Sequence, residues 1–138
     1  MALADAGSAA ALLMSPWARP DGAASSSPPA LCAAQGLALQ YFTQASWIWT
    51  ACLAWHLRTL ILHGRHRDVR VYHLLAWGVP ALQLMGLLST PGLFGESDRP
   101  WCWIASRADG AWRWDGAALQ LWVGHFPVAL ILAWNACA

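Results

Sequence analysis

The chain contains no lysine and a single glutamate, and only 11% of its 138 residues are charged. Soluble domains carry about 25% charged residues, so this chain lacks the polar surface that such a domain requires. The absence of lysine excludes the phosphate-binding loop of nucleotide hydrolases, which needs that residue. A formal net charge of +1, without a basic stripe, also argues against nucleic acid as a partner.

Signatures of catalysis and of metal binding are missing from the sequence as well. It contains neither Gly-x-Ser-x-Gly nor His-Glu-x-x-His, the motifs of serine hydrolases and zinc peptidases. Its four cysteines lack the spacing of a zinc site, and its acidic residues are scattered rather than paired. We therefore expect no enzymatic activity, no catalytic residue, no metal site and no cofactor.

The sequence does contain long apolar runs, because 58% of its residues are hydrophobic. A helix needs about 20 apolar residues to cross a membrane. The predicted membrane helices are 32–62, 71–88 and 117–138, preceded by a shorter partial helix at 1–14. The predicted connections are a linker at 15–31, a turn at 63–70 and a loop at 89–116. The sequence therefore predicts an all-α integral membrane helical bundle in a lipid bilayer.

The turn at 63–70 predicts the orientation of this bundle. It holds Arg65, Arg67 and Arg70, whereas the arginines of the 89–116 loop are offset by acidic residues. Arginine concentrated near helix ends marks the cytoplasmic side. We therefore expect a multi-pass protein of the plasma membrane, with the turn inside and both the loop and the N-terminus outside.

This orientation brings two cysteines to the same outer face. Cys32 opens the first long span and Cys102 lies in the outer loop, in an oxidising environment where disulfides persist. A bond between them would close a long loop and stabilise the folded chain by about 4 kcal/mol in the chain-entropy model. Two free thiols are the alternative. Cys52 and Cys137 lie within spans, where a buried packing role is commoner.

Polar side chains in the outer halves of the spans are candidates for ligand contact. Gln40 and Gln44 are one helical turn apart and share a face, and Gln83 lies on the following span. With Trp101 and Trp103 of the outer loop they could line an outward-facing cavity. The same glutamines could instead hold the helices together, at about 0.6 kcal/mol each.

Several motifs occur in the order found in one receptor family. They are Leu3–Ala4–Asp5, Gln35–Gly36 after Cys32, Gln40–Tyr41–Phe42, Trp77–Gly78–Val79–Pro80, Trp101–Cys102–Trp103–Ile104, and Leu121–Trp122 followed by Phe126–Pro127. In this order the chain resembles the seven-helix G-protein-coupled receptors of the slime-mould cyclic-AMP-receptor type, which are related to the secretin-like class. The resemblance covers nearly the whole chain.

The resemblance implies that the chain is a fragment holding helices two to five of a signalling receptor. Its parent would bind an unknown extracellular ligand and a heterotrimeric G protein. The first, sixth and seventh helices and the inner half of the second would be missing. Arginines at the predicted cytoplasmic edge would contact the G protein or, alternatively, anionic lipid headgroups; they are Arg58, Arg65, Arg67 and Arg70.

Two other functions compete with this interpretation. A truncated membrane protein could pair with other receptor helices through the small residues Gly78, Ala81 and Gly86. A membrane redox protein could hold haem through histidines, of which the chain has His56, His63, His73 and His125 in or beside its spans. Axial ligands must lie at one depth, and His125 belongs to the outer half of its span, unlike the others. This difference in depth argues against a shared haem and favours the receptor interpretation.

Overall fold

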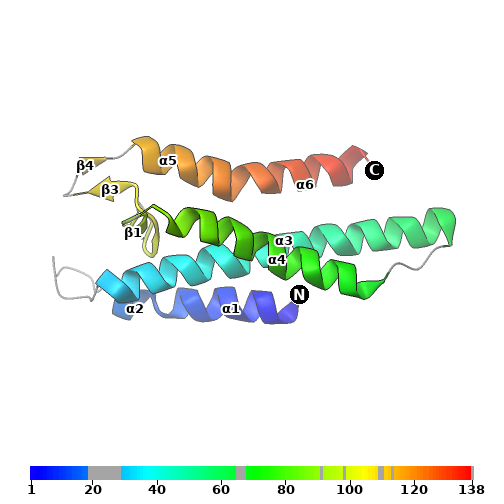
Figure 1. Cartoon of the computed structure of the whole chain (residues 1–138), viewed down its shortest axis with the longest axis horizontal. Coiled ribbons are helices and arrows are strands. Elements are labelled where there is room, and N and C mark those ends of the chain that lie inside the picture. Colours follow the sequence, from blue (N-terminus) through cyan, green and yellow to red (C-terminus); the bar gives the residue numbers. More distant parts are fainter. Residues whose placement is uncertain are drawn as a thin grey trace.

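The computed structural model describes residues 1–18, 29–64, 68–90, 92–97, 99–108, 111–112 and 114–137, and two predicted cytoplasmic arginines, Arg65 and Arg67, lie outside them. Within these residues the chain folds into an antiparallel helical bundle, so the predicted architecture is confirmed. Figure 1 shows short strands gathered at one end, here called the strand end. The connection between α3 (Pro29–His63) and α4 (Val69–Leu88) lies at the opposite end, the turn end.

The central element is α3, whose 35 residues give it a length of about 52 Å. The helix α1 (Ala2–Leu13) runs antiparallel along its first half and is followed by the short helix α2 (Ser15–Ala18). Helix α4 packs on another side of α3 and returns to the strand end. Because β1, β2 and α6 also pack on α3, this helix is the common support of the cavities described below.

The turn between α3 and α4 is defined by local signals. Gly64 has a φ of 60°, and its N–H donates to the carbonyl of Leu60 at 3.0 Å, which ends α3. Glycine is favoured at this position because the left-handed region is strained for other residues. The carboxylate of Asp68 accepts from the N–H of Arg70 at 2.9 Å and thereby caps the start of α4.

Pro80 lies inside α4, where it lacks the N–H that would bond to the preceding turn. On the same part of the helix, the hydroxyl of Tyr41 donates to the carbonyl of Trp77 at 3.4 Å. The two rings also stack, with centroids 6.1 Å apart. These contacts fix the proline-containing turn of α4 against the middle of α3.

The segment after α4 forms two small hairpins. Strand β1 (Phe94–Glu96) pairs antiparallel with β2 (Cys102–Ile104), so that Gly95 lies opposite Trp103. Strand β3 (Arg107–Ala108) pairs with β4 (Ala111–Trp112). The first hairpin packs against α3 and covers the strand end of the bundle.

The last rod runs from the strand end to the turn end in three parts. They are α5 (Trp114–Gln120), the π-helical segment η1 (Leu121–His125) and α6 (Phe126–Cys137). A π turn contains one residue more than an α turn and is often found at functional sites. Here it lies between α5 and α6, in the part of the rod nearer the strand end.

Two connections differ from the sequence-based expectation. The expected linker at 15–31 contains α2 and the start of α3. Pro16 and Pro29 stand at the beginning of these helices, where a missing N–H costs nothing and the fixed φ is already helical. The expected loop at 89–116 contains the four strands, and the last rod begins at Trp114 rather than at residue 117.

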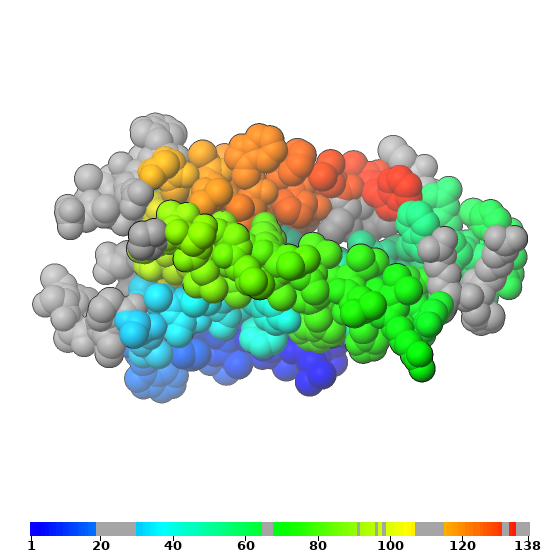
Figure 2. Space-filling model, viewed as in Figure 1, coloured from blue at the N-terminus to red at the C-terminus, as the bar shows by residue number. Residues whose placement is uncertain are grey.

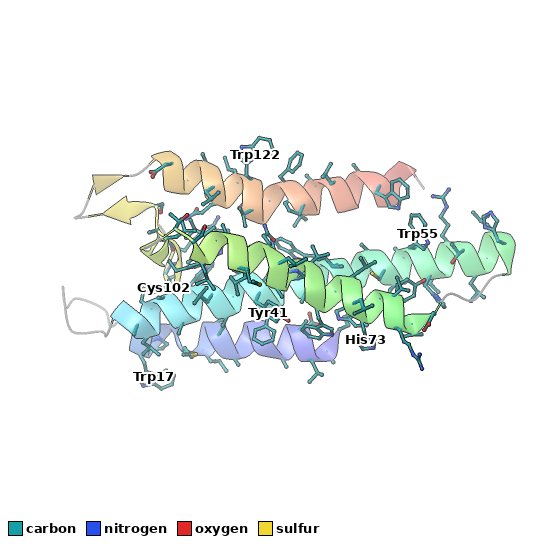
Figure 3. The ribbon with its side chains drawn as sticks, viewed as in Figure 1. Trp17, Tyr41, Trp55, His73, Cys102 and Trp122 are labelled. Atoms are coloured by element: carbon teal, nitrogen blue, oxygen red, sulfur yellow. A yellow bond between two sulfur atoms is a disulfide. The ribbon has the colours of Figure 1, made fainter. Side chains whose placement is uncertain are left out.

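The outer surface of the bundle is strongly apolar. On α4 the exposed side chains include Leu74, Leu75, Val79, Leu82 and Met85, and Figure 2 shows this helix at the front of the molecule. Trp17 and Trp122 point away from the bundle (Figure 3). Among the described residues, α4 alone is long and apolar enough by itself to cross a membrane. The other long rods fall short because α3 carries several polar residues and the last rod is divided.

Candidate functional site

The predicted disulfide is present at the strand end. Cys32 in the first turns of α3 is bonded to Cys102 at the start of β2, with their Cα atoms 5.3 Å apart. Both side chains are buried, together with Ala18 of α2. The bond therefore attaches the first hairpin covalently to the central helix, and Figure 3 shows its position.

A buried glutamine beside the disulfide joins three elements. The amide nitrogen of Gln35 donates to the carbonyl of Ala11 at 2.9 Å and to the hydroxyl of Ser15 at 2.8 Å. Its amide oxygen accepts from the N–H of Cys102 at 3.0 Å. This role of Gln35 was not predicted, although the residue lies one helical turn after Cys32 and so faces the same side of α3.

The first hairpin approaches α3 closely and thereby places its tryptophans. A Cβ atom on Gly36 would lie 3.1 Å from the ring of Phe94 and 3.2 Å from the Cα atom of Trp103, so only glycine fits there without displacing the hairpin. The hydroxyl of Ser97 donates to the carbonyl of Trp101 at 2.7 Å. These contacts direct Trp101 and Trp103 toward the space between α3 and the last rod.

A cavity of about 510 Å³ opens in this space, and we call it the first cavity. Four of the five predicted cavity residues line it, namely Gln40, Gln44, Trp101 and Trp103. The other residues of its wall are Leu12, Leu39, Thr43, Trp47, Arg99, Gly124, His125, Val128 and Ala129. Because α1, α3, the hairpin and the last rod all contribute, a ligand here would touch nearly every part of the bundle.

Two hydrogen bonds connect the walls of the first cavity. The indole N–H of Trp103 donates to the amide oxygen of Gln40 at 2.7 Å. The amide nitrogen of Gln44 donates to the carbonyl of Val123 at 2.7 Å. Pro127 explains why that carbonyl is available, since proline has no N–H to offer the residue four positions earlier.

The π-helical segment is fixed by its neighbours. The amide nitrogen of Gln120 donates to the carbonyl of Ile104 in β2 at 2.6 Å, and its side chain is buried. The ring nitrogen Nδ1 of His125 lies 3.3 Å from the carbonyl of Gln120. Gln120 was not among the predicted site residues, and His125 was considered only as a haem ligand. Their spacing of five residues follows from the π turn, which sequence periodicity did not indicate.

Replacing Gly124 by alanine should destabilise the wall of the first cavity. The new Cβ atom would lie 2.7 Å from Cη2 of Trp103, so the indole must move away from Gln40. We expect a loss of about 1–3 kcal/mol, measured as a lower unfolding temperature in detergent micelles. Gly86→Ala on α4 is the matched control, because its Cβ atom would meet nothing within 4 Å. Equal effects of both substitutions would contradict this packing.

The fifth predicted residue, Gln83, lines a different space. A second cavity of about 540 Å³ lies between α3, α4 and α6, and its walls are Gln44, Trp47, Ile48, Val79, Leu82, Gln83 and Pro127. Gln44 and Trp47 line both cavities and therefore form the wall between them. The structure thus divides the predicted residues between two adjacent cavities.

The turn end carries the described part of the predicted cytoplasmic group. Arg58 on α3 and Arg70 on α4 are both exposed there. Nearby, Nδ1 of His56 lies 3.3 Å from the hydroxyl of Tyr72. The rings of His73 and Trp49 pack edge to face, with their centroids 4.7 Å apart. His125 lies toward the strand end, as the depth argument against haem required. Among the described residues, no group of three metal-binding side chains comes together.

Comparison with known proteins identifies a family that matches the chain. A family model described as "7 transmembrane receptor (Secretin family)" matches residues 8–137. Over 111 residues, covering 78% of the chain, the sequence is 30% identical to the mouse "Cadherin EGF LAG seven-pass G-type receptor 3". It is 32% identical over 78 residues to "Cyclic AMP receptor 1" of Dictyostelium discoideum.

These relatives are much longer than the matched region. The chain spans 3% of the length of the mouse receptor. The match to Cyclic AMP receptor 1 includes 53% of the chain and 19% of that receptor. "Cyclic AMP receptor 4" from the same organism is 27% identical over 82 residues, which are 57% of the chain and 18% of that receptor. No solved structure gives a significant match.

Proposed function

Because the chain belongs to the secretin family of seven-transmembrane receptors, we propose that it forms helices two to five of a signalling receptor. It is accordingly a multi-pass membrane protein from a family of receptors, not of enzymes. In this proposal α1 is the outer half of the second helix, α3 the third, α4 the fourth, and α5, η1 and α6 together the fifth. The strand end faces outward from the plasma membrane. Because α1 runs toward that end, its first residues lie beside the middle of α3 and not at the outer face where the N-terminus was expected.

The observation that carries the proposal is the first cavity beneath the disulfide-linked hairpin. It opens beside Trp101 and Trp103 and reaches the buried amides of Gln40 and Gln44. An extracellular ligand entering at the strand end would therefore contact α3 and the last rod together. The walls offer aromatic surface and amide groups for such a ligand to bind.

Signalling would follow from a difference in ligand affinity between two helix arrangements. A ligand that binds one arrangement more tightly shifts the population toward it. The bonds from Gln40 to Trp103 and from Gln44 to Val123 hold the present arrangement of the cavity walls. A ligand that replaces the bond from Gln44 would release the last rod relative to α3, and one that replaces the bond to Gln40 would release the hairpin. The exposed arginines of the turn end, with Arg65 and Arg67, would then contact a heterotrimeric G protein in the longer receptor.

The proposed outward opening can be tested by chemical labelling in cells. Thr43 lines the first cavity, whereas Leu82 lines the second cavity and is exposed on the apolar face of α4. In a Cys52→Ala/Cys137→Ala background, which leaves no native thiol outside the disulfide, Thr43→Cys should react with a charged, membrane-impermeant thiol reagent added outside. Leu82→Cys is the matched control and should remain unlabelled, because lipid excludes the reagent.

Labelling of Thr43→Cys only after the membrane is permeabilised would contradict the proposed orientation. Loss of labelling when a bulky side chain is added at Gly124 would indicate entry beside Trp103. A reaction of both cysteines at the same rate would show that the reagent reaches the bundle nonspecifically, and the proposed outer cavity would then be wrong.

A further inference from the structure

Two glutamine amides in the first cavity have orientations that follow from their partners. The indole N–H of Trp103 can only donate, so it meets the amide oxygen of Gln40. The carbonyl of Val123 can only accept, so it meets the amide nitrogen of Gln44. Each amide therefore has one end held by the bundle and one end left over.

The ends left over are a donor and an acceptor on the same wall. Gln40 is 3% exposed and Gln44 is 5% exposed, and both line the first cavity. Within the described part of the chain, the nitrogen of Gln40 and the oxygen of Gln44 make no hydrogen bond. Helix α3 thus presents one unused donor and one unused acceptor to a ligand in this cavity.

The spacing of the two amides restricts the group that can meet both. Residues four apart on a helix share a face, with Cβ atoms about 5–6 Å apart. A matching group must present an acceptor and a donor side by side on one edge. A lactam or a primary carboxamide does so, because its C=O and one N–H point to the same side. The trans peptide bond of a protein chain points them to opposite sides, and a single hydroxyl offers only one atom.

The rest of the wall is suited to a flat aromatic body. Trp47 of α3 and the hairpin residues Trp101 and Trp103 line the cavity, together with aliphatic side chains such as Leu39 and Val128. Tryptophan rings pack favourably on other aromatic rings, offset face to face or edge to face. A planar ring system therefore gains more here than a flexible chain of the same size.

The remaining polar side chains of the wall favour an uncharged ligand. Among the described residues no acidic side chain lines the first cavity, and Arg99 is its one formally charged residue. Arg99 is exposed, and its guanidinium carbon lies 5.9 Å from the ring centroid of Trp101, at the rim. Thr43 and His125 already contact groups of α1 and α5. The deeper part of the cavity thus offers neutral amides and apolar surface.

We propose that the first cavity binds a neutral, planar aromatic ligand that carries a lactam or a primary carboxamide. The nitrogen of Gln40 donates to the ligand carbonyl, and the ligand N–H donates to the oxygen of Gln44. This inference rests on the proposed function, because it names the ligand class of the same cavity. Since the bonds to Trp103 and Val123 remain in place, such a ligand stabilises the present arrangement of α3, the hairpin and the last rod.

The test measures binding of matched small molecules to the whole chain in lipid nanodiscs, with empty nanodiscs as the blank for partition into lipid. Quinolin-2(1H)-one has the lactam, 1-methylquinolin-2-one lacks its N–H, and naphthalene lacks both polar groups. The lactam should bind about 3- to 10-fold more tightly than its N-methyl analogue, the value of one hydrogen bond, and should raise the unfolding temperature. Equal affinities for all three compounds, or equal binding of 2-naphthol, would overturn the proposal.

Variants assign the discrimination to the two amides. Gln44→Met should make the lactam and its N-methyl analogue bind equally, because the acceptor for the N–H is gone. Gln40→Met should weaken both compounds and leave naphthalene unchanged, whereas general damage to the cavity would weaken all three. Gln83→Met is the matched control, since Gln83 lines only the second cavity. Discrimination that persists in Gln44→Met would contradict the assigned contact.

The ligand class and the outward opening fail in different experiments. Both faces of a nanodisc are accessible, so the binding comparison does not depend on the orientation of the bundle in a cell. Thr43→Cys labelled from outside, together with equal affinities for the three compounds, would overturn the ligand class alone. Labelling only after permeabilisation, together with discrimination that depends on Gln44, would support the ligand class and overturn the orientation.

Discussion

Replacing Cys32 or Cys102 by serine will lower the free energy of unfolding by about 4 kcal/mol. The bond closes a loop with a sequence separation of 70 residues, so its loss returns a large conformational freedom to the unfolded chain. It also releases β2 from α3, and with it the hairpin that carries Trp101 and Trp103. Thermal unfolding in detergent micelles, followed by circular dichroism, measures the change.

Three comparisons make this prediction specific. Cys52→Ala should cost far less, because Cys52 is a free buried thiol without a covalent partner. The double variant Cys32→Ser/Cys102→Ser should be no less stable than either single variant, since one bond is lost in each case. Reductant should lower the stability of the unmodified chain and leave the serine variants unchanged. Additive losses in the double variant would mean that the two cysteines act separately.

Gln35→Leu will destabilise the strand end by about 3 kcal/mol. Gln35 is fully buried, and leucine would leave the buried N–H of Cys102 without an acceptor and remove the bonds to Ala11 and Ser15, although the Ser15 hydroxyl still donates to Leu12. Each buried group left unsatisfied costs about 1–3 kcal/mol. The same unfolding measurement applies, and the hairpin should also become more susceptible to proteolysis while the disulfide stays intact.

Gln83→Leu serves as the control for this substitution, because it is chemically identical and removes no hydrogen bond within the described residues. It should be neutral or slightly stabilising. If both leucine variants lose the same stability, the cost arises from replacing glutamine in general. The three bonds of Gln35 would then contribute little.

Much of the framework follows from the sequence for simple physical reasons. The apolar runs at 32–62 and 71–88 can be buried only as long helices, and the structure forms α3 and α4 there. With the 63–70 turn on one side and the 89–116 loop on the other, Cys32 and Cys102 come to one face, where the disulfide is found. The grouping of Gln40 and Gln44 with Trp101 and Trp103 is likewise observed at the first cavity. Whether these side chains contact a ligand stays a prediction.

The remaining parts depend on geometry that a single sequence does not encode visibly. Strands β1 and β2 have three residues each, too few for an alternating pattern, and the disulfide and Gly36 hold them in place. Gln83 was grouped with the other glutamines because it lies on the next helix. The packing of α4 against α3 instead directs it into the second cavity.

One partner could have been inferred from sequence alone. Pro127 removes an N–H from its helix, which leaves the carbonyl of Val123 in need of a donor. A polar side chain on a neighbouring helix is the available source in a membrane, and Gln44 provides it. Proline inside an apolar run therefore predicts a polar contact as well as a kink.

The π turn at Leu121–His125 has a consequence for comparing this helix with others. One additional residue in a turn rotates everything after it by about 100° relative to an uninterrupted α-helix. The residues from Phe126 onward therefore present a different side to α3 than a constant period of 3.6 would assign. When this helix is aligned with a relative that lacks the bulge, positions beyond His125 correspond in space only after a gap of one residue.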